Sequence, residues 1–153
     1  MVGELAGWLA ADDPAPWVVE TSGSTGTPKR VVLSRDAVLA SVRASARRVG
    51  ATGQWLLALP ASYVAGLQVV CRSLVAGHEP VLLDAHESFA AATAAMRPGD
   101  RFLSLVPTQL HRLLETDALS LATFHSVLIG GGPVDPALRE RAAAAGVHVV
   151  ATY

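Results

Sequence analysis

Apolar and polar positions along the chain form two alternating kinds of block. Short apolar runs, such as residues 54–59 and 102–106, are each followed by a proline, which is typical of strands buried on both faces of a parallel sheet. Longer segments repeat apolar residues at helical spacing, as in the helix predicted from Ser34 to about Val49. Strand and helix alternate throughout, which predicts an α/β layered fold with a mostly parallel sheet and flanking helices.

The other predicted elements follow the same alternation. Further strands are predicted at residues 17–20, 31–33, 80–83, 127–129 and 147–153, and further helices at residues 3–11, 64–76, 88–96, 135–145 and from Thr108 onward. Ligands of such sheets bind outside the carboxyl ends of the strands. We therefore expect the functional site among the loops at residues 21–29, 60–66, 107–108 and 130–133.

The loop at residues 21–29 combines glycines, hydroxyl side chains and one lysine between two predicted strands. Gly23 and Gly26 allow backbone N–H groups to approach an anion closely, and Lys29 adds a compact positive charge. The loop is not a Walker A motif, because Pro28 stands where the second glycine belongs and Arg30 where a hydroxyl belongs. The residues predict a phosphate-binding loop of another kind, and an ordinary turn is the alternative.

The full string T-S-G-S-T-G-x-P-K closely resembles the signature loop of adenylate-forming enzymes, the superfamily of acyl-CoA synthetases, peptide-synthetase adenylation domains and luciferases. In that family the loop holds the β- and γ-phosphates of ATP while a carboxylate attacks the α-phosphorus. The resemblance implies part of the large N-terminal domain of such an enzyme, with ATP, Mg²⁺ and coenzyme A as its small-molecule partners. It assigns ATP binding to Thr21, Ser22, Gly23, Ser24, Thr25, Gly26 and Lys29, with Thr25 and Lys29 acting in catalysis.

A glycine run and the final tyrosine complete the nucleotide site in this resemblance. The family places backbone glycine on one face of adenine and a tyrosine on the other, which here implies Gly131, Gly132 and Tyr153. Gly130, at the start of the run, is assigned to the acyl substrate. Taken alone, a triple glycine after a strand is usually only a turn.

Two side chains near the loop at residues 60–66 are expected to face the acyl substrate. Tyr63 stands where acyl-CoA synthetases often have histidine, so it keeps an aromatic wall without the imidazole; simple packing on a helix is the alternative. Arg72 is the only charge between residues 64 and 76, where a lone charge is costly unless it meets an anion. That anion is either a structural carboxylate or a second carboxylate of the substrate.

Within the superfamily, the resemblance is closest to the o-succinylbenzoate–CoA ligases of menaquinone synthesis, and it covers residues 17–153. It is carried by Leu59-Pro60-Ala61, Gly66-Leu67-Gln68-Val69, Arg72 and the string S-L-V-P-T-Q-L at residues 104–110. o-Succinylbenzoate has two carboxylates and a ketone, so Arg72 would hold the spare carboxylate. Another aryl- or fatty-acyl-CoA ligase, or a nonenzymatic nucleotide-binding module, is the alternative.

Parts of the adenylate-forming pattern have no counterpart in residues 1–153. In the family, a glutamate that binds Mg²⁺ follows the tyrosine, and a ribose-binding aspartate and a small C-terminal domain with a catalytic lysine are also present. We therefore interpret the chain as a partial N-terminal ATP- and acyl-binding domain of a larger ligase. Alone it is expected to bind nucleotide weakly and to catalyse little, because the charges around the phosphates are incomplete.

The composition argues against several other classes of protein. A net charge of −1 supplies no basic field for nucleic acid or an anionic membrane. Cys71 is the only cysteine, which excludes an internal disulfide, and the five histidines lack metal-ligand spacing. Neither a signal peptide nor an apolar run of bilayer length is present, so we expect a cytoplasmic protein. A hydrophobic content of 51% indicates a surface that is covered, which allows a homo-oligomer.

Overall fold

A five-stranded parallel sheet forms the centre of the protein. The computed structural model describes residues 1–21 and 29–152. Within this sheet the strand order is β4-β3-β5-β6-β7, and every neighbouring pair is parallel. The predicted α/β fold with a mostly parallel sheet is thereby confirmed. The strands are β3 (Gln54–Leu57), β4 (Val81–Leu82), β5 (Arg101–Leu105), β6 (Ser126–Ile129) and β7 (Val149–Ala151).

The first two strands, β1 (Trp17–Thr21) and β2 (Lys29–Leu33), form a separate antiparallel pair. The apolar pattern predicted both strands but not their separation from the central sheet. The reason is the length of the connection between the two strands. Residues 22–28 are long enough to join two antiparallel neighbours, whereas two parallel neighbours require a crossover of a dozen or more residues.

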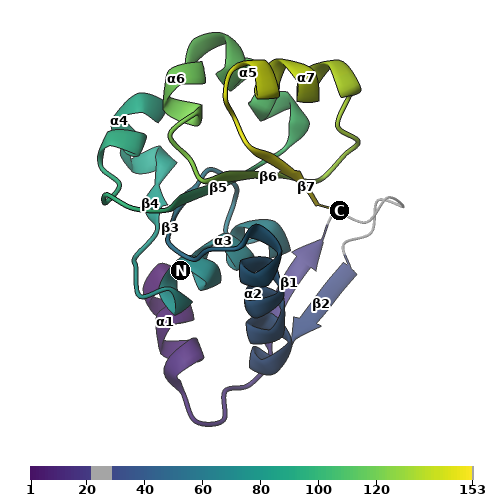
Figure 1. Cartoon of the computed structure of the whole chain (residues 1–153). Helices are drawn as coiled ribbons and strands as arrows, with labels where there is room; N and C mark the ends of the chain where they lie inside the picture. The colour runs from purple at the N-terminus through teal and green to yellow at the C-terminus, as the bar shows by residue number, and fades with distance from the viewer. Residues whose placement is uncertain (22–28, 153) are drawn as a thin grey trace.

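Helices cover both faces of the central sheet, as Figure 1 shows. On the upper face in that view lie α4 to α7, and α1, α2 and α3 lie below the sheet together with the β1–β2 hairpin. The bounds of the helices are α1 (Val2–Ala10), α2 (Arg35–Val49), α3 (Val64–Val75), the 3₁₀ turn η1 (Leu83–Ala85), α4 (Phe89–Ala94), α5 (Pro107–Thr116), α6 (Ala118–Leu121) and α7 (Pro136–Ala144).

The two faces of the sheet have separate apolar cores, as the two-residue period of a strand requires. Leu103 and Leu105 of β5 belong to the core beneath α4 to α7. Phe102 belongs to the opposite core, where it stacks on Trp55 of β3 with ring centroids 5.1 Å apart. The side chain of Ser104 follows the same alternation as Phe102, so it faces the side of the sheet that α3 covers.

Helix α3 is the most deeply buried of the helices below the sheet. Its buried residues lie on most of its circumference and include Leu67, Val69 and Val70, each with no exposed surface. The helix starts against the preceding loop, where a Cβ on Gly66 would lie 2.2 Å from the carbonyl oxygen of Pro60. Glycine is therefore required for α3 to begin at this place.

Several predicted helix ends are confirmed. Ser34 caps α2, since its hydroxyl accepts a hydrogen bond from the N–H of Ala37 at 3.2 Å. Gly50 ends the same helix in the left-handed conformation, with a φ of 79°. None of the helices in the described ranges is long and apolar enough to cross a membrane.

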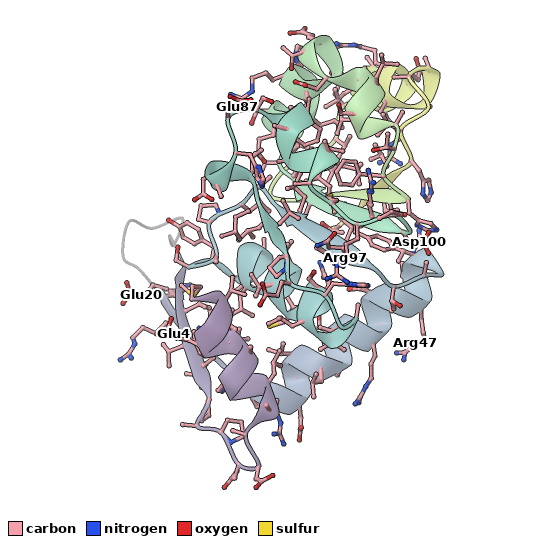
Figure 2. All side chains as sticks on the ribbon, turned by 90° about the vertical axis from the view of Figure 1, so that its left-hand side faces the viewer. Glu4, Glu20, Arg47, Glu87, Arg97 and Asp100 are labelled. Atoms are coloured by element: carbon pink, nitrogen blue, oxygen red, sulfur yellow. The ribbon has the colours of Figure 1, made fainter. Side chains whose placement is uncertain are left out.

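The direction of the sheet can be followed in Figure 2. Asp100, which immediately precedes β5, lies on one side of the molecule, and Glu20 and Glu87 lie on the opposite side. The parallel strands therefore run from the side of Asp100 toward the side of Glu20. Since Glu20 adjoins Thr21 at the end of β1, this end of the hairpin lies on the side where the sheet strands have their carboxyl ends.

Candidate functional site

A cavity of about 390 Å³ opens at the carboxyl ends of β5, β6 and β7, on the face that α3 covers. Helices α2 and α3 form one wall, and the sheet with its following loops forms the other. This is the position where an open α/β sheet binds its ligand. The lining residues are Ser41, Val64, Ala65, Gln68, Arg72, Ser104, Leu128, Gly131 and Thr152.

Arg72 supplies the positive charge of this cavity. Its guanidinium lies over the ring of Trp55, 5.0 Å from the ring centroid, and its Nε is buried without a hydrogen-bond partner. Burial lowers the pKa of Arg72 to about 10, and the neighbouring Cys71 opposes that shift. Among residues 1–21 and 29–152, no carboxylate forms an ion pair with Arg72.

Cys71, next to Arg72, is fully buried. Burial raises the pKa of its thiol to about 11, and the charge of Arg72 only partly offsets this effect. At neutral pH the group is therefore a thiol. The side chain packs with Leu67 and Val70 in the core below the sheet, which indicates a structural role.

The glycine run lies at the carboxyl end of β6. Gly131 lines the cavity and has a φ of 77°, which a residue with a side chain adopts only with strain. The N–H of Gly130 donates to the carbonyl of Leu105 at 3.1 Å, which ties the run to β5. Gly132 follows, and a Cβ there would lie 3.9 Å from Pro107. The structure thus brings Gly131 and Arg72 to one cavity.

The end of the described chain is held at the same edge of the sheet. Both the N–H and the hydroxyl of Thr152 donate to the carbonyl of Ile129, at 2.7 and 3.1 Å. Thr152 also lines the cavity. Tyr153, the residue predicted to stack on adenine, lies outside the described residues.

The phosphate loop is described only at its two ends. Thr21 and Lys29 are paired with each other as the last residue of β1 and the first residue of β2. Lys29 is exposed. Predicted site residues Ser22, Gly23, Ser24, Thr25 and Gly26 lie outside the described residues.

Tyr63 is not among the residues that line the Arg72 cavity. It is the N-cap of α3 and is 47% exposed. Its side chain lines a separate hollow of about 500 Å³, together with Trp17 and Glu20 of the hairpin. Val64, the next residue, does line the Arg72 cavity. The two hollows therefore lie on either side of the start of α3.

Sequence reasoning missed Gln68 and Ser104, which also line the Arg72 cavity. Gln68 had a usable signal, since it is a polar residue in an apolar helix and precedes Arg72 by four positions. The only sequence signal for Ser104 was its position near the end of an apolar strand. As for metals, the described ranges hold no group of three or more His, Cys, Asp or Glu side chains arranged to bind an ion.

Comparison with protein families now adds to this geometry. The family profile described as "AMP-binding enzyme" matches residues 5–153. The chain belongs to the AMP-binding enzyme family. The predicted recognition of the adenylate-forming superfamily is thereby confirmed.

Individual relatives point to one group within this family. A probable 2-succinylbenzoate–CoA ligase of Mycobacterium tuberculosis is 41% identical over 160 residues, which cover 100% of this chain and 42% of that protein. The chain therefore spans less than half the length of this relative.

Two solved structures are similar at 30% identity. Escherichia coli MenE with a bound analogue of OSB-AMS has a TM-score of 0.73, covering 89% of this chain and 29% of the other. The o-succinylbenzoate coenzyme A synthetase of Bacillus subtilis, in complex with ATP and magnesium ion, has a TM-score of 0.69, covering 86% and 28%.

Proposed function

We propose that this chain is part of the large N-terminal domain of an acyl-CoA ligase that acts on o-succinylbenzoate. The observation that carries the proposal is Arg72: a partly buried cation with a buried Nε, without a carboxylate partner among the described residues, in a cavity that also reaches Gly131 and Thr152. The similar chains named 2-succinylbenzoate–CoA ligase support the same substrate.

The substrate would be held by its spare carboxylate. An arginine in a place of low dielectric binds a carboxylate through charge-assisted hydrogen bonds, which are stronger than those between neutral groups. The apolar side chains of Val64, Ala65 and Leu128 in the same lining suit the aromatic ring. In this arrangement Arg72 and Gly130 adjoin the acyl group. We assign Tyr63, which lines the neighbouring hollow at the start of α3, to the outer edge of the acyl site.

The nucleotide would occupy the other end of the site. We assign adenine to Gly131, Gly132 and Tyr153, and the phosphates to Thr21, Ser22, Gly23, Ser24, Thr25, Gly26 and Lys29. Backbone N–H groups, hydroxyls and one ammonium suit a polyphosphate, and Lys29 and Thr25 would stabilise the charge that develops on it during transfer. The described residues offer no cluster for Mg²⁺, so its carboxylate ligand is assigned to a part of the protein beyond this chain.

The reaction has two steps that together conserve all atoms. A substrate carboxylate oxygen bonds to the α-phosphorus of ATP, and pyrophosphate leaves. The coenzyme A thiolate then bonds to the acyl carbon, and AMP leaves. The second step and the catalytic lysine are assigned to the whole ligase, since the chain spans 42% of its M. tuberculosis relative. We place this enzyme in the cytoplasm and allow it to form a homo-oligomer.

A pyrophosphate-release assay tests the proposal with the full-length ligase that contains this chain. We expect ATP-dependent release with o-succinylbenzoate and much slower release with benzoate and fatty acids. Absence of pyrophosphate with every acid would overturn the proposed enzyme activity. Equal rates with all acids would overturn the substrate assignment alone.

A further inference from the structure

Two neutral polar side chains, Gln68 and Ser104, lie in the Arg72 cavity without forming a hydrogen bond among the described residues. Both are almost fully buried, at 8% exposed each. Burial of a polar group is unfavourable unless a partner satisfies it, so nearly all such groups in proteins are hydrogen-bonded. Only the Oε1 of Gln68 is fully buried without a partner, whereas the Nε2 of Gln68 and the hydroxyl of Ser104 remain accessible in the lining. A ligand in the cavity can therefore pair with these two accessible groups.

The position of Gln68 relative to Arg72 shows which part of a ligand it would meet. The two residues are four apart on α3, so they lie on one face of the helix with their Cβ atoms about 5–6 Å apart. The Oε1 of Gln68 is buried without a partner. Nε2 is then the polar atom of this side chain that faces the cavity. This face of α3 therefore carries a hydrogen-bond donor, Nε2 of Gln68, beside the cation of Arg72.

We propose that the amide of Gln68 donates a hydrogen bond to a neutral carbonyl oxygen of the acyl substrate, beside the carboxylate that Arg72 binds. This inference rests on the proposed function and adds a specificity-determining residue to it. In o-succinylbenzoate the ketone and the ring carboxylate are attached to adjacent ring carbons, so one helix face reaches both. Gln68 thereby selects a keto acid over the same acid with a methylene in place of the ketone.

Substitution of Gln68 by methionine in the full-length ligase tests this role. Methionine keeps the length and volume of the side chain and removes the donor. Pyrophosphate release is measured with o-succinylbenzoate and with 2-(3-carboxypropyl)benzoate, the methylene analogue. We expect kcat/KM to fall about tenfold for the keto acid, mainly through KM, because a neutral hydrogen bond is lost. For the methylene analogue we expect no change.

A purely structural role for Gln68 gives a different result. Because Gln68→Met removes a buried oxygen without a partner, we expect its thermal unfolding temperature to equal or exceed that of the original protein. Gln68→Leu serves as a second variant with the same expected selectivity. Equal falls in kcat/KM for both acids, or no fall for the keto acid, would overturn the role of Gln68. Failure of the unsubstituted ligase to use either acid would instead overturn the proposed function.

Discussion

The guanidinium of Arg72 lies over the indole ring of Trp55, and on that side both residues line a second, small and largely apolar hollow. Its pKa of about 10 keeps it charged at neutral pH, although burial disfavours the charge. A carboxylate in the cavity would relieve that cost and raise the pKa again. We therefore expect the charge at this single position to select among acids under the proposed function.

Replacement of Arg72 by leucine is expected to lower kcat/KM for o-succinylbenzoate by about 10- to 100-fold in the full-length ligase. The reason is the loss of a hydrogen bond to a charged group, which contributes about 1.5–3 kcal/mol. The matched substrate is 4-oxo-4-phenylbutanoate, which lacks the ring carboxylate and should be used equally well by both proteins. An unchanged preference between the two acids would show that Arg72 has a structural role only.

A pH profile of the unsubstituted ligase gives a second measurement. The guanidinium is protonated below its pKa of about 10, so the anion contact is complete at neutral pH and is lost as the pH rises through that value. We expect KM for o-succinylbenzoate to rise above pH 10 and KM for 4-oxo-4-phenylbutanoate to stay level across the same range. A parallel rise for both acids would contradict the assignment.

The sequence predicted the roles of some single residues better than those of others. Arg72 stood out because a charge in an apolar helix is costly, and the structure shows it lining a cavity. Gln68 gave a weaker signal than Arg72, because it is polar but uncharged, and it was not predicted as a site residue. Tyr63 was predicted from its position in a motif, but sequence spacing does not give the direction of a side chain at a helix start.

At the scale of elements, the start of α3 depends on contact between a glycine and the backbone before it. The Cα of Gly66 approaches Pro60 so closely that no side chain fits between them. Tyr63 and Pro60 also form a backbone hydrogen bond, at 3.2 Å, which closes the turn into the helix. Because Gln68 and Arg72 follow on the same helix, this contact fixes where both side chains enter the cavity.

We expect Gly66→Ala to lower the free energy of unfolding by about 2 kcal/mol or more, because the added methyl displaces α3 from the loop. Gly7→Ala in α1 is the matched control, since nothing lies within 4 Å of its Cβ position. Alanine at that helical site should be neutral or stabilising by up to about 1 kcal/mol. Urea denaturation of the chain measures both, and equal stability of the two variants would contradict the packing argument.

The order of the strands and of the longer helices was predictable, because it depends on local periodicity. The short α6 and η1 were not predicted, and neither was the pairing partner of each strand. The runs around Val19 and Val31 indicated two strands correctly. Their pairing as a separate hairpin depends on what lies on either side of them, and periodicity carries no such information. By contrast, the prolines after β3 and β5 and the cap at Ser34 marked element ends, because proline and capping residues act within a few positions.

At the scale of the whole molecule, one face of the hairpin remains uncovered. Val18 and Val32 face each other across the two strands and are 40% and 63% exposed. Adjacent β-branched residues on a two-stranded ribbon form an apolar surface of the kind that associates with other chains. The high apolar content of the sequence predicted a surface that is covered by a partner, and these two exposed residues are a candidate for it.

The isolated chain is expected to self-associate through this surface at high concentration. The double substitution Val18→Thr and Val32→Thr keeps β-branched side chains but replaces a methyl by a hydroxyl at each site. We expect it to lower the apparent mass by light scattering. Leu119→Gln on α6, where the side chain is 89% exposed, is the control and should change little. The same mass for all three proteins would contradict the role of the hairpin.

The contact between Arg72 and Trp55 has a practical consequence. Because the guanidinium charge lies beside the indole ring, we expect a ligand that moves it to change the ultraviolet emission of Trp55. Trp55 is one of three tryptophans, and the other two, Trp8 and Trp17, pack against each other in another part of the molecule. The protein thus contains an optical reporter beside its cavity, and occupancy can be followed without any attached dye.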